Sequence, residues 1–127
     1  MTKLSGKNVL VTGGAGFIGS NLVKRLAGQG CAVRATIHEK KPLEPVAGVE
    51  YVTVDLMSPN DCRKVVDGMD YVFICSANTA GAAVMAATPL VQVTPNVVMN
   101  TQLLDSSYAA GVKKVCFISS SAAYPDT

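Results

Sequence analysis

A strand, a glycine-rich turn and the start of a helix follow one another near the beginning of the chain. Residues 9–11 are apolar, and from Phe17 the apolar residues recur at helical spacing. Three glycines, Gly13, Gly16 and Gly19, stand between and just beyond these elements at Gly-x-x-Gly-x-x-Gly spacing. Such glycines allow a tight turn, a close approach to a ligand and close packing of helix on strand. The pattern predicts that the free N–H groups of the helix start bind a dinucleotide pyrophosphate; a glycine turn without a ligand is the alternative.

The rest of the chain alternates between strand-like and helix-like segments. Strands are expected at residues 9–11, 31–37, 49–54, 70–75 and 113–119, and helices at about 17–26, 58–67 and 90–110. The last helix contains Pro95, where we expect it to be broken or entered late. Strands that alternate with helices indicate βαβ units and a parallel sheet. We therefore expect one α/β domain over residues 1–127, a doubly wound parallel sheet of the Rossmann type.

Charge and cysteine usage exclude several classes of function. The net charge is +2, so neither nucleic acid nor an anionic membrane surface is expected as a partner. No apolar run reaches the ~18 residues of a membrane span, and the first residues do not resemble a signal peptide. No metal site is expected either, because no Cys-x-x-Cys pair occurs and there is one histidine. Cysteines in or beside apolar runs favour a reducing, cytoplasmic location. They are Cys31, Cys75 and Cys116, with Cys62 in a predicted helix.

Several motifs together resemble those of the extended short-chain dehydrogenase/reductase family, the NAD(P)-dependent epimerases, dehydratases and reductases of nucleotide sugars. The resemblance runs over the whole chain, and family members are much longer. It rests on the following residues: Thr12-Gly13-Gly14-Ala15-Gly16-Phe17-Ile18-Gly19, Asp55-Leu56, Ser76-Ala77-Asn78, Asn96-Val97, and Ser119-Ser120-Ser121 with Tyr124.

The resemblance implies a role for each motif in holding the cofactor. The glycine turn, with Phe17 and Ile18 at the helix start, would hold the pyrophosphate. Asp55 would accept a hydrogen bond from the adenine amino group, and Leu56 would pack on the adenine ring. Residues Ser76, Ala77 and Asn78 would line the nicotinamide ribose. For Asp55, a solvated strand-end carboxylate or a helix cap is the alternative, and Asn96 is expected to bridge backbone groups rather than to contact a ligand.

The end of the second predicted strand bears on which dinucleotide is bound. NAD-binding proteins of this kind usually carry Asp or Glu there, to accept from the ribose 2′-OH. Here that position is Ile37, and His38, Lys40 and Lys41 follow it. Cations without a carboxylate suit a 2′-phosphate, so NADP(H) is preferred and NAD(H) is the alternative. Glu39 weakens this indication of NADP(H). A basic loop that is exposed to solvent and binds no ligand also fits the pattern.

The resemblance also implies catalytic groups. Alignment from Tyr124 places the family's catalytic hydroxyl at Ser120, with Ser121 as the alternative. The family's Tyr-x-x-x-Lys pair, which moves the proton, does not occur in this sequence. The chain therefore resembles the amino-terminal cofactor half of such an enzyme, truncated after the fifth strand, and we expect it to be inactive alone.

The expected strand order, 3-2-1-4-5, makes the strand at 113–119 an edge. Its apolar sequence is nevertheless typical of an interior strand. An exposed apolar edge strand tends to pair with another chain. We therefore expect a homodimer, or a sticky protein, formed through that edge.

Three functions remain open at this point. The first is hydride transfer between a nicotinamide and a sugar carbon of a nucleotide-sugar substrate. Residues 77–81 and 120–125 resemble the GDP-fucose synthase and GDP-mannose epimerase branch, although Ala122 stands where that branch usually has cysteine. The second is NADPH-dependent reduction of a non-sugar substrate, because residues 33–38 resemble dihydroflavonol reductases and hydroxysteroid dehydrogenases. The third is a non-catalytic dinucleotide-binding module.

Overall fold

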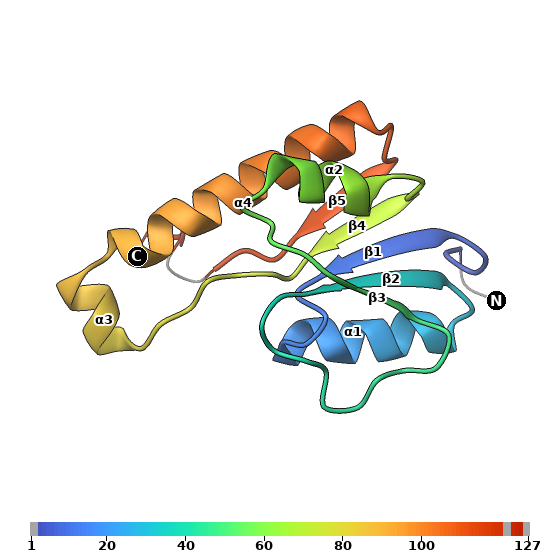
Figure 1. Cartoon of the computed structure of the whole chain (residues 1–127), viewed down its shortest axis with the longest axis horizontal. Helices are drawn as coiled ribbons and strands as arrows, with labels where there is room; N and C mark the ends of the chain where they lie inside the picture. The colour runs from blue at the N-terminus through green and yellow to red at the C-terminus, as the bar shows by residue number, and fades with distance from the viewer. Residues whose placement is uncertain (1–2, 121–122, 126–127) are drawn as a thin grey trace.

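Five strands alternate with helices in the computed structural model, which describes residues 3–120 and 123–125 (Figure 1). In chain order the elements are β1 (Asn8–Thr12), α1 (Phe17–Gly28), β2 (Ala32–Ile37), β3 (Glu50–Thr53), α2 (Pro59–Val66), β4 (Tyr71–Ile74), α3 (Ala82–Ala87), α4 (Leu90–Ala109) and β5 (Lys114–Phe117). None of the helices in the described ranges is long and apolar enough to cross a membrane.

The strands form one parallel sheet in the order β3-β2-β1-β4-β5. This confirms the predicted α/β class and the predicted order, with β5 at an edge. The carboxyl ends of the strands therefore meet along one side of the sheet, where doubly wound proteins bind ligands. The strand order reverses between β2 and β4, which both pair with β1.

Helices cover the two faces of the sheet unequally. On one face, α1 packs its Val23 and Leu26 against Val9 and Val11 of β1. On the other face, α2 and α4 pack against a second cluster that includes Leu10. Because successive side chains of a strand point to opposite faces, β1 is buried on both sides. The central position of β1 in the sheet thus explains why its sequence is an apolar run.

Two details of the helices differ from the sequence prediction. Residues 82–87, expected as loop, form the short helix α3, which consists largely of alanine, the residue with the highest helix propensity. Helix α4 runs through Pro95 instead of breaking there. Pro95 lies in its second turn, so the missing N–H removes one hydrogen bond near the start of the helix.

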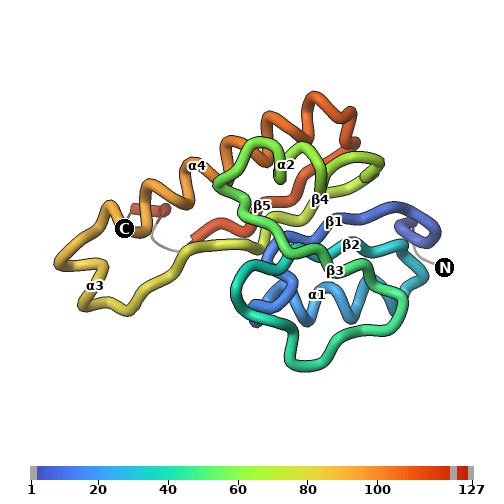
Figure 2. Tube along the Cα trace, in the orientation of Figure 1, coloured from blue at the N-terminus to red at the C-terminus, as the bar shows by residue number. Residues whose placement is uncertain are grey.

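The segment from the end of β4 through α3 to the first turns of α4 projects beyond the sheet (Figure 2). It carries no charged residue, since none occurs between Asp70 and Asp105. All six residues of α3 are exposed. This part of the chain therefore differs from the covered sheet in having apolar side chains on the surface.

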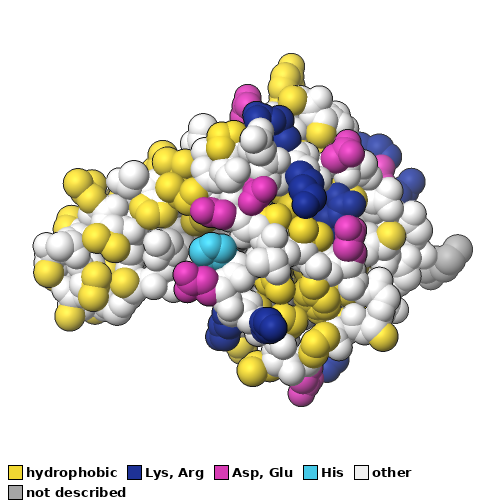
Figure 3. All heavy atoms as spheres, viewed as in Figure 1, with side chains coloured by type: hydrophobic (Ala, Val, Ile, Leu, Met, Phe, Trp, Pro, Cys, Tyr) yellow, Lys and Arg dark blue, Asp and Glu magenta, His cyan; other side chains and the backbone are white. Residues whose placement is uncertain are grey.

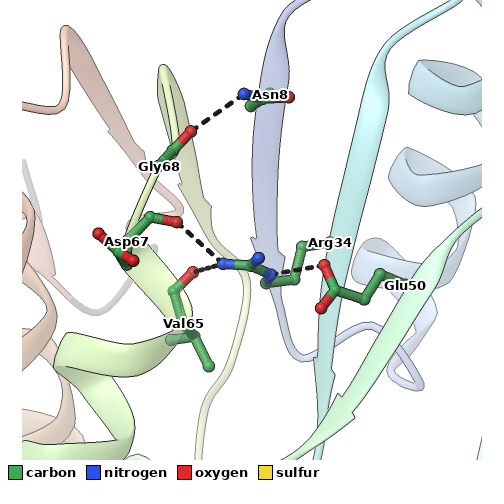
Figure 4. A network of polar contacts seen from close by, with 6 residues as sticks. All are labelled: Asn8, Arg34, Glu50, Val65, Asp67 and Gly68. Atoms are coloured by element: carbon green, nitrogen blue, oxygen red, sulfur yellow. Dashed lines mark hydrogen bonds and ion pairs between the residues drawn. The ribbon is translucent and has the colours of Figure 1, made fainter.

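One arginine ties three elements together at the opposite end of the sheet (Figure 4). Arg34 of β2 donates through Nε to Glu50 Oε2 at 2.7 Å and through Nη1 to the carbonyl oxygens of Val65 and Asp67, each at 3.0 Å. A cation at the carboxyl end of α2 also interacts favourably with the helix dipole. Arg34 thereby stabilises the end of the sheet away from the glycine turn.

Candidate functional site

The glycine turn between β1 and α1 is packed too closely for side chains at its key positions. Gly13 has φ +70°, and a Cβ there would stand 2.8 Å from the Ser76 Cα. A Cβ at Gly19 would overlap the Gly13 carbonyl oxygen, because α1 rests directly on the turn. Both glycines are therefore required by close approach, as the sequence pattern predicted.

The backbone N–H groups of the turn differ in whether they have an acceptor, and that of Gly16 donates to the Gly13 carbonyl at 3.0 Å. Those of Gly13 and Gly14 donate to Thr36, at 3.1 Å to its hydroxyl and 2.7 Å to its carbonyl oxygen. Those of Phe17 and Ile18 have no acceptor among the described residues, and Gly16 offers no side-chain cap. No acidic residue lies in the first turn of α1. Unpaired donors at the positive end of a helix dipole make a place for an anion.

Thr12 joins the ends of β1 and β4 beside the turn. Its fully buried hydroxyl oxygen accepts from the backbone N–H groups of Cys75 and Ser76, both at 3.2 Å, and lies 2.8 Å from the Ser76 hydroxyl oxygen. Thr12 and Thr36 were not predicted as site residues. Thr12 stands in the first motif of the family resemblance, and the sequence signal for Thr36 is a hydroxyl near the end of a strand.

A cavity of about 630 Å³ opens above the turn at the carboxyl ends of the strands. It brings together most of the residues proposed for the cofactor, namely Gly13, Gly16, His38, Lys40, Asp55, Leu56, Ser76, Ala77 and Asn78. Thr36, Glu39, Met57, Cys75 and Pro95 also line it. Phe17, Ile18, Gly19, Lys41 and Ser120 do not line it.

The residues after β3 form one wall of the cavity. Asp55 is exposed, and one of its carboxylate oxygens accepts from the Met57 N–H at 2.9 Å. This bond closes a turn before α2 and is not the helix cap that the sequence left open, because the N-cap of α2 is Ser58. The other carboxylate oxygen of Asp55 has no hydrogen bond among the described residues. Leu56 lines the cavity but is 7% exposed and packs in the core with Val54 and Cys62.

A second wall is the loop that follows β4, and two side chains of α4 hold it. The side-chain amide of Asn96 accepts from the Asn78 N–H at 2.7 Å and donates to the Asn78 carbonyl at 2.9 Å. Gln92 donates to the carbonyl of Ala80 at 2.9 Å. The bridging role predicted for Asn96 is confirmed, whereas Gln92 was missed because glutamine in a helix carries no such signal.

The basic loop after β2 is exposed. His38, Glu39 and Lys40 line the cavity, whereas Lys41 is exposed and does not line it. In the part of the chain that the structure describes, none of the ion pairs involves these four residues. Lys40 and Glu39 therefore stand at this end of the cavity without charged partners among the described residues, and His38 lines the cavity beside them.

Of the two predicted catalytic serines, the structure describes Ser120, which does not line the cavity. Ser120 is exposed three residues after β5, and its carbonyl accepts from the Ala123 N–H at 3.0 Å. Ser121 lies outside the described residues. Tyr124 is exposed.

The four cysteines are free thiols, of which Cys62 is buried, Cys31 and Cys75 are half-buried and Cys116 is exposed. Burial, with the nearby Asp61 and Asp55 carboxylates, raises the pKa of Cys62 to about 11, and its thiol donates to the Leu56 carbonyl at 3.2 Å. Burial also raises the pKa of Cys75 at the cavity wall, and Cys116 adds to the shift. Within the described ranges no cluster of side chains suited to a metal ion occurs.

Comparison with known proteins identifies relatives of the whole chain. The model of the NAD dependent epimerase/dehydratase family matches residues 9–127. GDP-mannose 3,5-epimerase 1 of Oryza sativa subsp. japonica is 30% identical over 120 residues, which are 93% of this chain and 32% of that protein. A 3 beta-hydroxysteroid dehydrogenase/Delta 5-->4-isomerase of Mycobacterium tuberculosis is 34% identical over 115 residues, which are 88% of this chain and 31% of that protein.

A solved structure shares the fold. MoeE5, determined in complex with UDP-glucose and NAD, superposes with a TM-score of 0.77 at 30% identity, over 94% of this chain and 38% of that one. The chain thus spans about a third of the length of the curated relatives that it matches.

Proposed function

The chain belongs to the NAD dependent epimerase/dehydratase family, and we propose that residues 1–127 form a dinucleotide-binding domain that takes NADP(H). The observation that carries this proposal is the pair of unpaired N–H groups of Phe17 and Ile18 beside a cavity of about 630 Å³. A pyrophosphate seated on the glycine turn satisfies both donors and meets the positive end of the α1 dipole.

The adenosine half of the ligand lies toward β2 and β3 in this proposal. Asp55 uses the carboxylate oxygen not bonded to Met57 to accept from the adenine amino group. Leu56 offers only its small accessible surface, because most of the side chain is in the core. The adenine ring is thus held by one polar contact and a limited apolar one.

The preference for NADP(H) rests on the charges at the end of β2. Lys40 lines the cavity and provides positive charge for a 2′-phosphate, and His38 lines the cavity as a hydrogen-bonding side chain. Ile37 offers no acceptor for a ribose 2′-OH. Lys41 contributes at longer range. Glu39 opposes the preference, and the NAD named with MoeE5 supports NAD(H) as the alternative.

The nicotinamide half lies toward β4. Ser76, Ala77 and Asn78 line its ribose, and Asn96 holds that loop in place. Bound NADP(H) supplies or accepts a hydride at a substrate carbon. Ser120, with Ser121 as the alternative, donates a hydrogen bond to the substrate oxygen. Because the sequence contains no Tyr-x-x-x-Lys pair, we expect binding of the dinucleotide without turnover by this chain.

A nucleotide sugar is the proposed substrate of the whole enzyme. The GDP-mannose 3,5-epimerase and the UDP-glucose bound to MoeE5 support this class. The hydroxysteroid dehydrogenase relative supports a non-sugar substrate as the second candidate. A non-catalytic dinucleotide-binding module is the third, and turnover of any substrate by the chain would exclude it. The proposal includes a homodimer and a cytoplasmic location, the latter because all four cysteines are free thiols.

The test is a calorimetric titration of the protein with NADPH and with NADH. We expect both to bind and NADPH to bind more tightly. Lys40→Glu should reverse the preference, because it replaces a cation with a carboxylate at the cavity wall. Lys64→Glu on the exposed face of α2 is the matched control and should leave both affinities unchanged, because Lys64 neither lines the cavity nor pairs with the loop after β2. If neither dinucleotide binds or shifts the melting temperature, the proposed function is wrong.

A further inference from the structure

The adenine ring of the proposed ligand needs an apolar contact that Leu56 does not supply. Ligand sites combine apolar side chains with a few polar groups that fix orientation. Asp55 provides such a polar group for the edge of the ring. The family resemblance assigns the apolar contact to Leu56, but that side chain is 7% exposed and packs in the core. The faces of the ring therefore require other side chains.

Two methionines and a proline offer accessible apolar surface in the same cavity. Met57 directly follows Leu56, is 40% exposed and lines the cavity. Met99 and Pro95 of α4 are half-buried and also line it. They are four residues apart and so lie on one side of the helix. None of these three side chains carries a charge or a hydrogen-bond donor. We call Met57 and Met99 the methionine pair.

The backbone around Met57 is fixed by hydrogen bonds. Its N–H donates to Asp55 Oδ1 at 2.9 Å, and its carbonyl accepts from the side-chain amide of Gln102 at 3.2 Å. The Asp55 N–H donates to Asp61 Oδ2 at 2.9 Å, and the Asp55 carbonyl accepts from the Ser58 N–H at 2.9 Å. The segment that carries both the carboxylate and a thioether is thus in place before a ligand arrives, which lowers the entropy cost of binding.

Helix α4 holds Met99 between two walls of the cavity. Asn96 bonds the backbone of Asn78 in the loop after β4. Gln102 bonds the Met57 carbonyl in the segment after β3. Met99 lies three residues from each of them, on the same side of a stretch roughly 9 Å long. It also packs against the core cluster. The Met99 thioether is therefore supported from behind by the core where it lines the cavity.

Charge divides the lining of the cavity. Among the described residues, its charged side chains are Glu39, Lys40 and Asp55, which follow β2 and β3. The wall from α4 is uncharged, because no charged residue occurs between Asp70 and Asp105. Figure 3 shows hydrophobic side chains gathered over α3 and the first turns of α4. The α4 wall therefore suits the uncharged part of a dinucleotide, a base, and not a phosphate.

We propose that the methionine pair holds the adenine ring of the dinucleotide, with the thioethers of Met57 and Met99 against the ring and Asp55 at its amino edge. Methionine is unbranched and polarizable, and its sulfur makes favourable contacts with aromatic rings. This inference rests on the proposed function, because it requires a dinucleotide in this cavity. It assigns to the methionine pair the contact that the resemblance gives to Leu56.

Methyl NMR tests the contact directly. Adenosine 2′,5′-bisphosphate is the probe, because it carries adenine and no nicotinamide, and the protein is labelled with [methyl-13C]methionine. An aromatic ring shifts the resonance of a methyl group that packs against its face. We expect the probe to shift the Met57 and Met99 resonances and to leave that of Met85 in place. Met85 is 50% exposed and does not line the cavity. The variants Met57→Leu, Met99→Leu and Met85→Leu, which conserve side-chain volume, assign the resonances.

Calorimetry separates failure of this inference from failure of the proposed function. The labelled protein is also saturated with NADPH, for which we expect the same two shifts. If NADPH binds and the Met57 and Met99 resonances do not move, the methionine pair does not hold the adenine ring and the proposed function stands. If NADPH does not bind, the proposed function is wrong and this inference falls with it.

The contribution of Met57 to affinity is measured with a matched pair of variants. Met57→Ala keeps both backbone hydrogen bonds and removes the thioether, so NADPH and the bisphosphate should each bind about five- to tenfold more weakly. Met85→Ala removes a similarly exposed thioether outside the cavity and should change neither affinity. A Met57→Ala protein that melts at a lower temperature but binds both ligands as tightly as the wild type would make Met57 purely structural and overturn its role.

Oxidation gives an independent readout on the unlabelled protein. Hydrogen peroxide transfers one oxygen atom to a thioether, which becomes a sulfoxide, and leaves as water. NADP+ is the ligand here, because it is already oxidised. We expect bound NADP+ to slow oxidation of Met57 several-fold and to leave the rate at Met85 unchanged, as measured by peptide mass spectrometry. Equal rates of Met57 oxidation with and without bound NADP+ would contradict the contact.

Discussion

Strands β1 and β5 have similar apolar sequences but very different surroundings. Every side chain of residues 9–12 in β1 is buried, whereas in β5 only Val115 is as much as half-buried. The reason is position. In the part of the chain that the structure describes, β1 has a neighbour on both sides and helices on both faces, while β5 has one strand neighbour and packs against α4 on one face. Apolar composition therefore indicates a strand, and the order of the sheet decides how far the strand is buried.

The difference in burial between β1 and β5 can be tested most directly by truncating one side chain in each strand. Leu10→Ala in β1 removes a fully buried side chain from the core and should lower the free energy of unfolding by about 3–5 kcal/mol. Phe117→Ala in β5 should lower it by less than about 1 kcal/mol in the monomer, because half of that side chain is exposed. Urea unfolding at low protein concentration measures both values. Similar losses at the two sites would mean that β5 is covered in solution.

A second prediction concerns the turn that β1 holds in place. Phe17→Pro removes one of the two unpaired N–H groups at the first position of α1, where proline is tolerated. Gly16 before it is already extended, with φ −78° and ψ 170°, as a residue before proline should be. A hydrogen bond to a charged group contributes about 1.5–3 kcal/mol, so NADPH should bind about 10- to 100-fold more weakly.

The matched control for that change is Phe17→Ala, which keeps the N–H and removes the exposed ring. It should bind NADPH nearly as well as the wild type in the same calorimetric titration. Equal losses of affinity in the two variants would show that the Phe17 ring causes the effect and that the Phe17 N–H does not contribute to binding.

The smallest expected effect lies where β5 begins. Asp70 accepts from Lys113 Nζ at 2.8 Å and from the Asn8 N–H at 2.9 Å, so it joins the starts of β1, β4 and β5. The hydrogen bond from Lys113 and that from Asn8 lower the pKa of Asp70. A carboxylate with a lowered folded-state pKa stabilises the protein above the pKa of the unfolded chain, and this contribution is lost as the pH falls through the folded pKa.

Unfolding measured against pH should therefore separate the wild type from Asp70→Asn. The wild type should be slightly more stable near neutral pH, and the difference should disappear in acid, below the ordinary aspartate range. The pKa of Lys113 is raised by Asp70, so the same difference should also shrink at strongly alkaline pH. If the stability difference between the two proteins does not change with pH, the Asp70–Lys113 pair does not stabilise the fold through its charges.

The glycine turn and the alternation of strands and helices could be recognised from the sequence because both depend on residues close together in the chain. Gly13, Gly16 and Gly19 stand within seven positions of one another, and each strand is a short apolar run. The bridging role of Asn96 was expected from the family resemblance, and the edge position of the last strand was expected from the strand order 3-2-1-4-5. Roles that depend on which way a side chain points, such as those of Leu56 and Lys41, were not predictable in this way.

The sequence by itself determined the elements of this protein and the type of turn at its site, because backbone conformation and hydrophobic periodicity are local properties. Only the tertiary structure decided that Thr36 accepts from Gly13, 23 residues away, and that Thr12 meets Ser76, 64 residues away. It also decided that Leu56 lies in the core and that β5 pairs with one strand, β4, in the described part of the sheet. Such contacts join distant segments, and they exist only once the order of the strands brings those segments together.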